Sequence, residues 1–191
     1  MRSRMPFLTR VLITLFLGAI MTAPGAYADE GSPAITVGTQ EVGLTAGYML
    51  PHRLTADHTT KQKGPAFMPS WMMTLTDPVG DGWYRGQVSI GAEVVYIQFR
   101  EPVLTHGIGF TPKIKYSFVA LDQVRPYVEF AGGPFWTDLG GKIPEESSRF
   151  NFVLTAGFGL SWFITPQTSL NVGYRFHHIS NAGTRYPNLG L

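Results

Sequence analysis

The feature that most constrains this chain is a two-residue alternation of apolar and polar side chains. It is clearest in FNFVLTAGFGLSWF, residues 150–163, where every even position is apolar. The odd positions between them are small or polar, with a valine at 153 as the exception. Because successive side chains of a β-strand point to opposite sides, this segment predicts a strand with one apolar face and one polar face.

The same alternation recurs from residue 35 onward, with little helical periodicity between the repeats. In residues 41–50, 87–96 and 107–120 the even positions are again largely apolar, and the odd ones largely polar, charged or glycine. The pattern is weaker in residues 126–137 and weakest near residue 72. It predicts seven strands, at about residues 35–50, 67–76, 83–99, 105–121, 124–137, 149–163 and 168–180.

Two properties favour a membrane barrel over a secreted soluble β-protein, which would also alternate. Many of the predicted strands have ten or more residues, whereas strands in soluble proteins have about five or six. Strands of about 9–11 residues, apolar outside and polar inside, are typical of outer-membrane barrels. The polar face also holds glycines and isolated charges, which we expect to pair inside a narrow lumen; these charges are Glu93, Lys113, Lys115, Glu129 and Arg175.

The connections between the predicted strands alternate in length. Short turns follow the strands ending near residues 76, 121 and 163, and longer connections follow those ending near 50, 99 and 137. Short periplasmic turns and longer outer loops are the rule in such barrels, so the strand over 168–180 should end near the outer leaflet. Closure requires an even number of strands, because unpaired backbone groups in lipid cost several kcal/mol each. We therefore expect an all-β, eight-stranded antiparallel outer-membrane barrel. Either its last strand is missing from this chain or one strand was miscounted.

The first 28 residues have the composition of a secretory signal peptide. Arginines at positions 2, 4 and 10 precede an apolar run over residues 11–21, and Ala26 and Ala28 supply the small residues that a signal peptidase reads. The run is too short to span a bilayer, and no later segment reaches eighteen consecutive apolar residues. We expect cleavage after Ala28 and one barrel domain over residues 29–191.

The composition after this leader excludes several classes of function. Of the 15 basic residues, three lie in the leader, so 12 basic side chains face 13 acidic ones. A net charge near zero argues against nucleic acid as a partner. The absence of cysteine excludes a disulfide framework and a thiolate metal site.

The closing stretch RFHHISNAGTRYPNLGL, residues 175–191, carries the candidate catalytic residues. His178 and Ser180 continue the apolar face of their strand, where residues two apart are neighbours on one side. A serine beside a histidine base is the minimum arrangement for acyl transfer, and a site against the membrane favours a lipid ester as substrate. The same spacing also arises by chance between polar residues of an interfacial girdle.

The letters HISNAG, residues 178–183, with Pro187, Asn188 and Gly190 after them, resemble the H-x-S-N motif of the PagL family of outer-membrane lipid A 3-O-deacylases. This resemblance implies a site on the lipid-facing exterior that acts on lipid A of lipopolysaccharide among the outer-membrane lipids. Ser180 would be the nucleophile and His178 the general base. Asn181 would lie beside the oxyanion, where a side-chain or backbone N–H stabilises charge. No metal or cofactor is implied.

The family's third catalytic residue, a glutamate, would fall one position beyond Leu191. Other acids are poor substitutes, since Glu93 and Glu129 should face the lumen and Glu145 and Glu146 should lie in a different outer loop. Either a segment beyond Leu191 supplies the carboxylate or the triad is incomplete.

The remaining candidates have structural interpretations. His177 should face the lumen, and His52 and His58 with Asp57 fit a solvated loop better than a metal site. The four tryptophans fit aromatic girdles. Two rival functions stay open: a passive small barrel with a structural or adhesive role, and a soluble lipocalin-like binder. A homodimer is one option for the oligomeric state.

Overall fold

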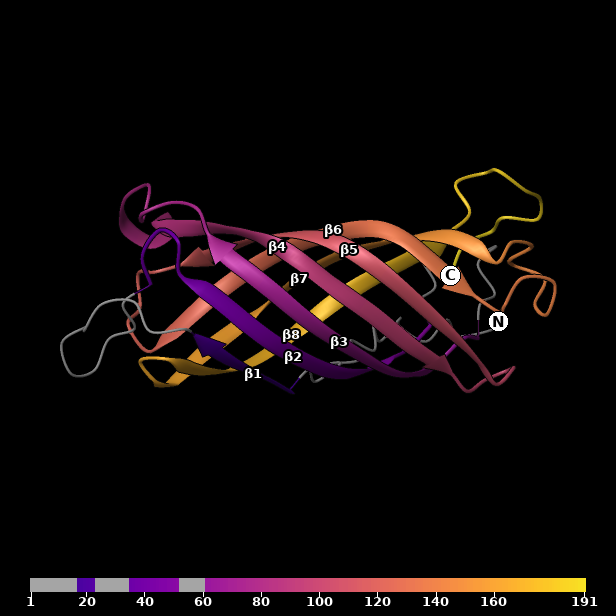
Figure 1. The fold of residues 1–191 in the computed structure, drawn as a ribbon, viewed down its shortest axis with the longest axis horizontal. Helices are drawn as coiled ribbons and strands as arrows, with labels where there is room; N and C mark the ends of the chain where they lie inside the picture. The colour runs from indigo at the N-terminus through magenta and orange to yellow at the C-terminus, as the bar shows by residue number, and fades with distance from the viewer. Residues whose placement is uncertain (1–16, 23–34, 52–60) are drawn as a thin grey trace, which may run out of the picture.

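The computed structural model describes residues 17–22, 35–51 and 61–191. In these residues eight antiparallel strands form one closed barrel in which each strand pairs with its neighbours in sequence and β1 pairs with β8 (Figure 1). The predicted eight-stranded antiparallel barrel is therefore confirmed. No helix in the described part of the chain is long and apolar enough to cross a membrane. The strands are β1 Leu17–Thr22, β2 Gln40–Met49, β3 Gly64–Thr74, β4 Gly86–Phe99, β5 Thr105–Phe118, β6 Val124–Thr137, β7 Phe150–Thr165 and β8 Thr168–Ser180.

Strands β2 to β8 are the seven that the alternation predicts. The largest displacement is at the start of β2, which begins at Gln40 and not near residue 35. Smaller displacements occur at the start of β4, where the 3-10 helix η1 (Gly82–Tyr84) precedes the strand, and at the end of β5. The predicted alternation of connection lengths is wrong at one place. The connection after β4 covers only residues 100–104, whereas the one after β3 covers residues 75–85. Loop length reflects what a loop packs against, and strand periodicity carries no information about it.

The eighth strand, β1, comes from the apolar run that was expected to belong to the signal peptide. It pairs with residues 41–46 of β2 and with residues 168–171 of β8. Because β1 has only six residues, it leaves most of the β8 edge uncovered. The rest of the leader, residues 1–16 and 23–28, lies outside the described residues, and its cleavage stays a prediction.

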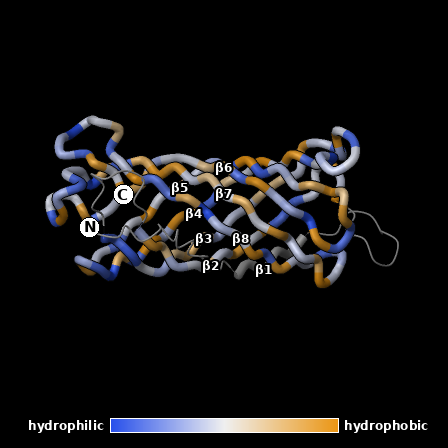
Figure 2. The backbone as a smooth tube through the Cα atoms, turned by 180° about the vertical axis from the view of Figure 1, so that it is seen from behind, coloured by the Kyte–Doolittle hydropathy of each residue, from blue (hydrophilic) through white to orange (hydrophobic). Residues whose placement is uncertain are grey.

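The barrel wall separates an apolar exterior from a mixed interior, and the two kinds of residue alternate along the strands in Figure 2. On β5 the odd positions from 105 to 115 are buried and the even positions from 106 to 114 exposed. β3 has the opposite parity, with Met68 and Met72 buried and Phe67 and Trp71 exposed. All four tryptophans are exposed, as the girdle prediction requires; they are Trp71, Trp83, Trp136 and Trp162.

The middle of the lumen is filled by charged side chains that pair across the barrel, as predicted. Lys113 of β5 contacts Glu129 of β6 at 2.7 Å and Glu93 of β4 at 3.3 Å. Arg175 of β8 contacts Glu93 at 2.8 Å and also pairs with Glu129. The side chains of these four residues are at most 7% exposed, and the set joins β4, β5, β6 and β8.

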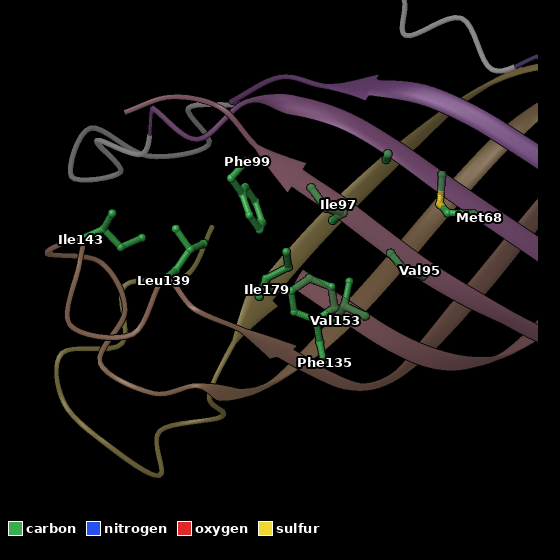
Figure 3. Packing of buried hydrophobic residues seen from close by; sticks show 10 residues of the cluster. Met68, Val95, Ile97, Phe99, Phe135, Leu139, Ile143, Val153 and Ile179 are labelled. Atoms are coloured by element: carbon green, nitrogen blue, oxygen red, sulfur yellow. The ribbon is translucent and has the colours of Figure 1, made fainter. Parts of the chain in front are cut away.

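Between this charged cluster and the loops at the end of β8, the lumen contains an apolar cluster. Phe135, Val153 and Ile179 lie together there, from β6, β7 and β8 (Figure 3). The connection over residues 138–149, called the 138–149 loop below, adds two further side chains to the same core. The end of β8 is thus anchored from inside the barrel by packing. The buried members of this cluster are Ala66, Met68, Val95, Ile97, Phe99, Phe135, Leu139, Ile143, Val153 and Ile179.

Candidate active site

His178 and Ser180 lie at the end of β8 on the outer face of the barrel. Ile179 between them is 1% exposed and belongs to the apolar core, so the two flanking side chains point to the other side of the sheet. His178 stands opposite Leu154 of β7, and Ser180 stands opposite Phe152. Both of these partners are exposed apolar residues. The histidine and the serine are therefore polar side chains at the rim of an apolar wall.

His177 occupies the other face of the same strand. It stands opposite Thr155, which is buried in the lumen. The parity of β8 therefore separates the two adjacent histidines, with one on each side of the wall. This placement agrees with the structural interpretation of His177.

The segment after β8, residues 181–191, folds back onto the strand it has just left. The backbone N–H of Leu191 donates to the carbonyl of Ile179 (2.9 Å), and the N–H of Ile179 donates to the carbonyl of Leu191 (3.1 Å). These two bonds form the start of an antiparallel ladder on the β8 edge that is not paired with β7. The chain therefore passes directly beside His178.

Gly190 in this segment lies close to the ring of His178. A Cβ added to Gly190 would lie 2.6 Å from Cε1 of His178, and the φ of this residue is +75°. Only glycine satisfies both conditions without strain. The segment thus packs against the His178 ring at Gly190.

Asn181, directly after Ser180, is completely buried and joins three parts of the site. Its side-chain amide donates to Oε1 of Glu146 (2.8 Å) and to the carbonyl of Arg185 (2.8 Å). Its backbone N–H donates to Oδ1 of Asn188 (3.0 Å), and its carbonyl accepts from Thr184. The structure therefore makes Asn181 the centre of the hydrogen-bond network that holds the 181–191 segment.

The partner of Asn181, Glu146, comes from the 138–149 loop, which lies at the same end of the barrel (Figure 1). Oε1 of Glu146 also accepts from the backbone N–H groups of Ser147 (2.9 Å) and Ser148 (3.0 Å). This contact could not be predicted from the sequence, because loop residues have no periodicity that relates them to β8.

The other acids of the barrel are engaged elsewhere. Glu41, Glu93 and Glu129 form ion pairs within the lumen. No group of three or more His, Asp or Glu side chains able to hold a metal occurs among the described residues. His52, Asp57 and His58 lie outside them.

A closed barrel with an apolar exterior defines a class of proteins, the membrane β-barrels, and here a histidine and a serine lie at the rim of the outer face. The family model for lipid A 3-O-deacylases (PagL) matches residues 42–191, and the chain belongs to this family. The resemblance inferred from the HISNAG motif is thus confirmed. The family comprises ester hydrolases of lipid A that are outer-membrane β-barrels. Neither the curated proteins nor the solved structures contain a match.

Proposed function

We propose that this protein is an outer-membrane serine esterase that hydrolyses the ester-linked acyl chain at position 3 of lipid A. The observation that carries the proposal is the placement of His178 and Ser180 on one outward face, beside Phe152 and Leu154. A lipid whose acyl chains lie along this apolar wall would bring an ester bond to the rim. Because lipid A occupies the outer leaflet, we also propose that this end of the barrel faces outward, and that residues 1–28 direct secretion.

The proposed reaction proceeds through an acyl-enzyme. Oγ of Ser180 attacks the ester carbonyl while the imidazole of His178 takes the hydroxyl proton. Collapse of the tetrahedral intermediate breaks the bond to the sugar oxygen, which receives that proton. Water then attacks the seryl ester while His178 takes a proton from it, and His178 passes this proton to Oγ as the acyl–oxygen bond breaks, so that one water is consumed. The products are a free fatty acid and a lipid A with a free 3-hydroxyl.

Asn181 is proposed to lie beside the oxyanion that forms in this reaction. Its side-chain and backbone N–H groups already donate to Glu146, Arg185 and Asn188. A direct role for its amide therefore requires one of these bonds to be exchanged for the substrate oxygen. The alternative is a backbone N–H after Ser180, whose direction Asn181 controls. Either donor would act on charge that develops only in the transition state.

For the carboxylate that orients His178, we propose the position that continues the ladder past Leu191. Leu191 pairs with Ile179, so the next residue of an antiparallel ladder would stand opposite His178 on the same outward face. Such directly opposed side chains are within about 4.5–5.5 Å at Cβ, close enough for a carboxylate to contact an imidazole.

The proposal is tested by the lipid A of cells that express the protein, analysed by mass spectrometry. Wild type should remove the position-3 chain, and Ser180→Ala should lower the rate by at least about a thousandfold, because no second nucleophile replaces the hydroxyl. The heat-modifiable migration of the folded barrel should be unchanged. If wild-type cells retain the acyl chain, or if Ser180→Ala cells remove it equally well, the protein is instead a passive barrel.

A further inference from the structure

We propose that Glu146 is a positioning residue of the esterase site, acting through Asn181 on the backbone that follows Ser180. The inference rests on the proposed function, and it concerns a residue that neither the H-x-S-N motif nor the alternation of the strands singles out. Three observations carry it: the contacts of the carboxylate, its burial without a cation, and the position of Asn181 in the chain.

The three hydrogen bonds of the Glu146 carboxylate all involve the same oxygen atom. Oε1 accepts from Nδ2 of Asn181 at 2.8 Å and from the N–H groups of Ser147 and Ser148. The two backbone donors come from the residues directly after Glu146, so they fix its carboxylate within its own loop. The third donor, Asn181, belongs to a different segment and directly follows Ser180. Glu146 is therefore a rigid point against which Asn181 is held.

The burial of the Glu146 carboxylate indicates a functional role for this residue. The residue is 0% exposed, and none of the ion pairs in the described part of the chain includes it. A buried carboxylate without a cation is unfavourable, and such groups concentrate at functional sites. Complete burial also prevents Glu146 from touching a lipid substrate. Its effect on the reaction must therefore pass through Asn181.

The position of Asn181 explains why this anchor matters. The chain turns sharply there, because Ala182 and Gly183 have φ of +54° and +77°, a conformation that is unfavourable for the alanine. The turn directs the backbone N–H groups after Ser180 and starts the segment that brings Gly190 against His178. A side chain that holds Asn181 in place therefore holds both the backbone next to Ser180 and the segment that lies against His178.

Two further hydrogen bonds join the 138–149 loop to the 181–191 segment, and they identify a matched control variant. Ser147 Oγ donates to the carbonyl of Pro187 (2.9 Å), and Leu189 N–H donates to the carbonyl of Glu145 (2.9 Å). Glu145 is 6% exposed and contacts the segment through its backbone, which a substitution to alanine preserves. Glu145→Ala therefore removes the same charge from the same loop and leaves the Asn181 anchor in place.

The first test measures deacylation of lipid A by the full chain in detergent micelles. Glu146→Ala should lower kcat by about tenfold to a hundredfold with little change in KM, since a displacement of about 1 Å has this cost. Glu146→Gln keeps an acceptor oxygen for Asn181 and should restore most of the rate, while Glu145→Ala should match wild type. Equal activity of Glu146→Ala and wild type, or a change confined to KM, would overturn the proposal.

The second test asks whether Glu146 acts through Asn181. The double variant Glu146→Ala/Asn181→Ala should be no slower than Asn181→Ala alone, because both substitutions break the same bond. Fully additive losses would mean that Glu146 acts by another route, and would contradict the inference.

A third measurement is independent of activity and separates failure of the inference from failure of the proposed function. Arg185 is exposed within the 181–191 segment, and Arg85 is exposed directly before β4, at the opposite end of the barrel. Glu146→Ala should accelerate tryptic cleavage at Arg185 several-fold but leave cleavage at Arg85 unchanged. If wild type is inactive and Glu146→Ala still accelerates cleavage at Arg185, the esterase proposal fails, but the inference that Glu146 holds Asn181 in place is supported. Unchanged cleavage at Arg185 in Glu146→Ala would contradict the inference that Glu146 holds this segment in place, whatever the activity of the enzyme.

Discussion

The lumen contains two neighbouring regions that are packed in different ways. In the middle, Glu93, Lys113, Glu129 and Arg175 form a cluster of ion pairs that joins four strands. Toward the end that carries the site, an apolar cluster lies in the lumen and Ile179 packs within it. Met68 lies at the boundary, with its sulfur 3.3 Å from Nη1 of Arg175.

The two regions differ in how strictly their side chains require particular partners. Buried ion pairs require particular partners, and removal of one partner leaves a charge unsatisfied. Apolar packing depends mainly on volume and shape, so small changes have small costs. The charged region therefore fixes which strands face one another, whereas the apolar region supports the end of β8 without imposing partners. This comparison leads to three predictions, from the largest effect to the smallest.

Arg175→Met should have the largest effect on stability. It leaves Glu93 and Glu129 to share Lys113, and the loss of one partner from a buried ionic cluster costs about 3–5 kcal/mol. Urea unfolding in micelles, followed by heat-modifiable migration, measures this cost. Lys63→Met is the control, because Lys63 and Glu101 form a solvent-exposed pair whose loss should have little effect on stability. Equal effects of the two variants would mean that the buried cluster contributes no more to stability than an exposed pair.

Gly190→Ala should have an intermediate effect on stability and a specific effect on catalysis. Its positive φ costs an alanine about 1–2 kcal/mol, and the new Cβ would displace the His178 ring. Gly38→Ala is a matched control before β2, at the opposite end of the barrel, with a φ of +83° and no atom within 4 Å of the added Cβ. Both variants should lose similar stability by urea unfolding, but only Gly190→Ala should lower kcat. A similar loss of kcat in both would mean that strain alone controls the site.

Ile179→Val should have the smallest effect. Loss of one buried methylene costs about 0.5–1.5 kcal/mol. Ile97→Val makes the same change in the same apolar cluster, on β4 and away from His178 and Ser180. The two variants should unfold at similar urea concentrations, and kcat should fall measurably only for Ile179→Val. If Ile97→Val lowers kcat as much, the apolar region acts on the site as a whole and not through β8.

Much of the barrel could be predicted because strand periodicity is a local property. The alternation located β2 to β8, assigned the charges to the lumen and placed His178 and Ser180 on the outer face. The pairing of Arg175 with Glu93 could not be predicted, because it depends on which strands closure brings together. The same holds for β1, whose apolar residues fit a signal peptide and a membrane strand equally well.

The sequence by itself determined the faces of the wall, because side-chain direction along a strand follows from position alone. It also carried the histidine, the serine and the family motif in one short stretch. Only the tertiary structure brought Glu146 to Asn181 and Gly190 to His178. The first contact joins two loops that are 35 residues apart along the chain, and the second folds a segment back onto the strand that precedes it. Their paths depend on hydrogen bonds and burial at the barrel rim, for which the sequence has no repeating pattern.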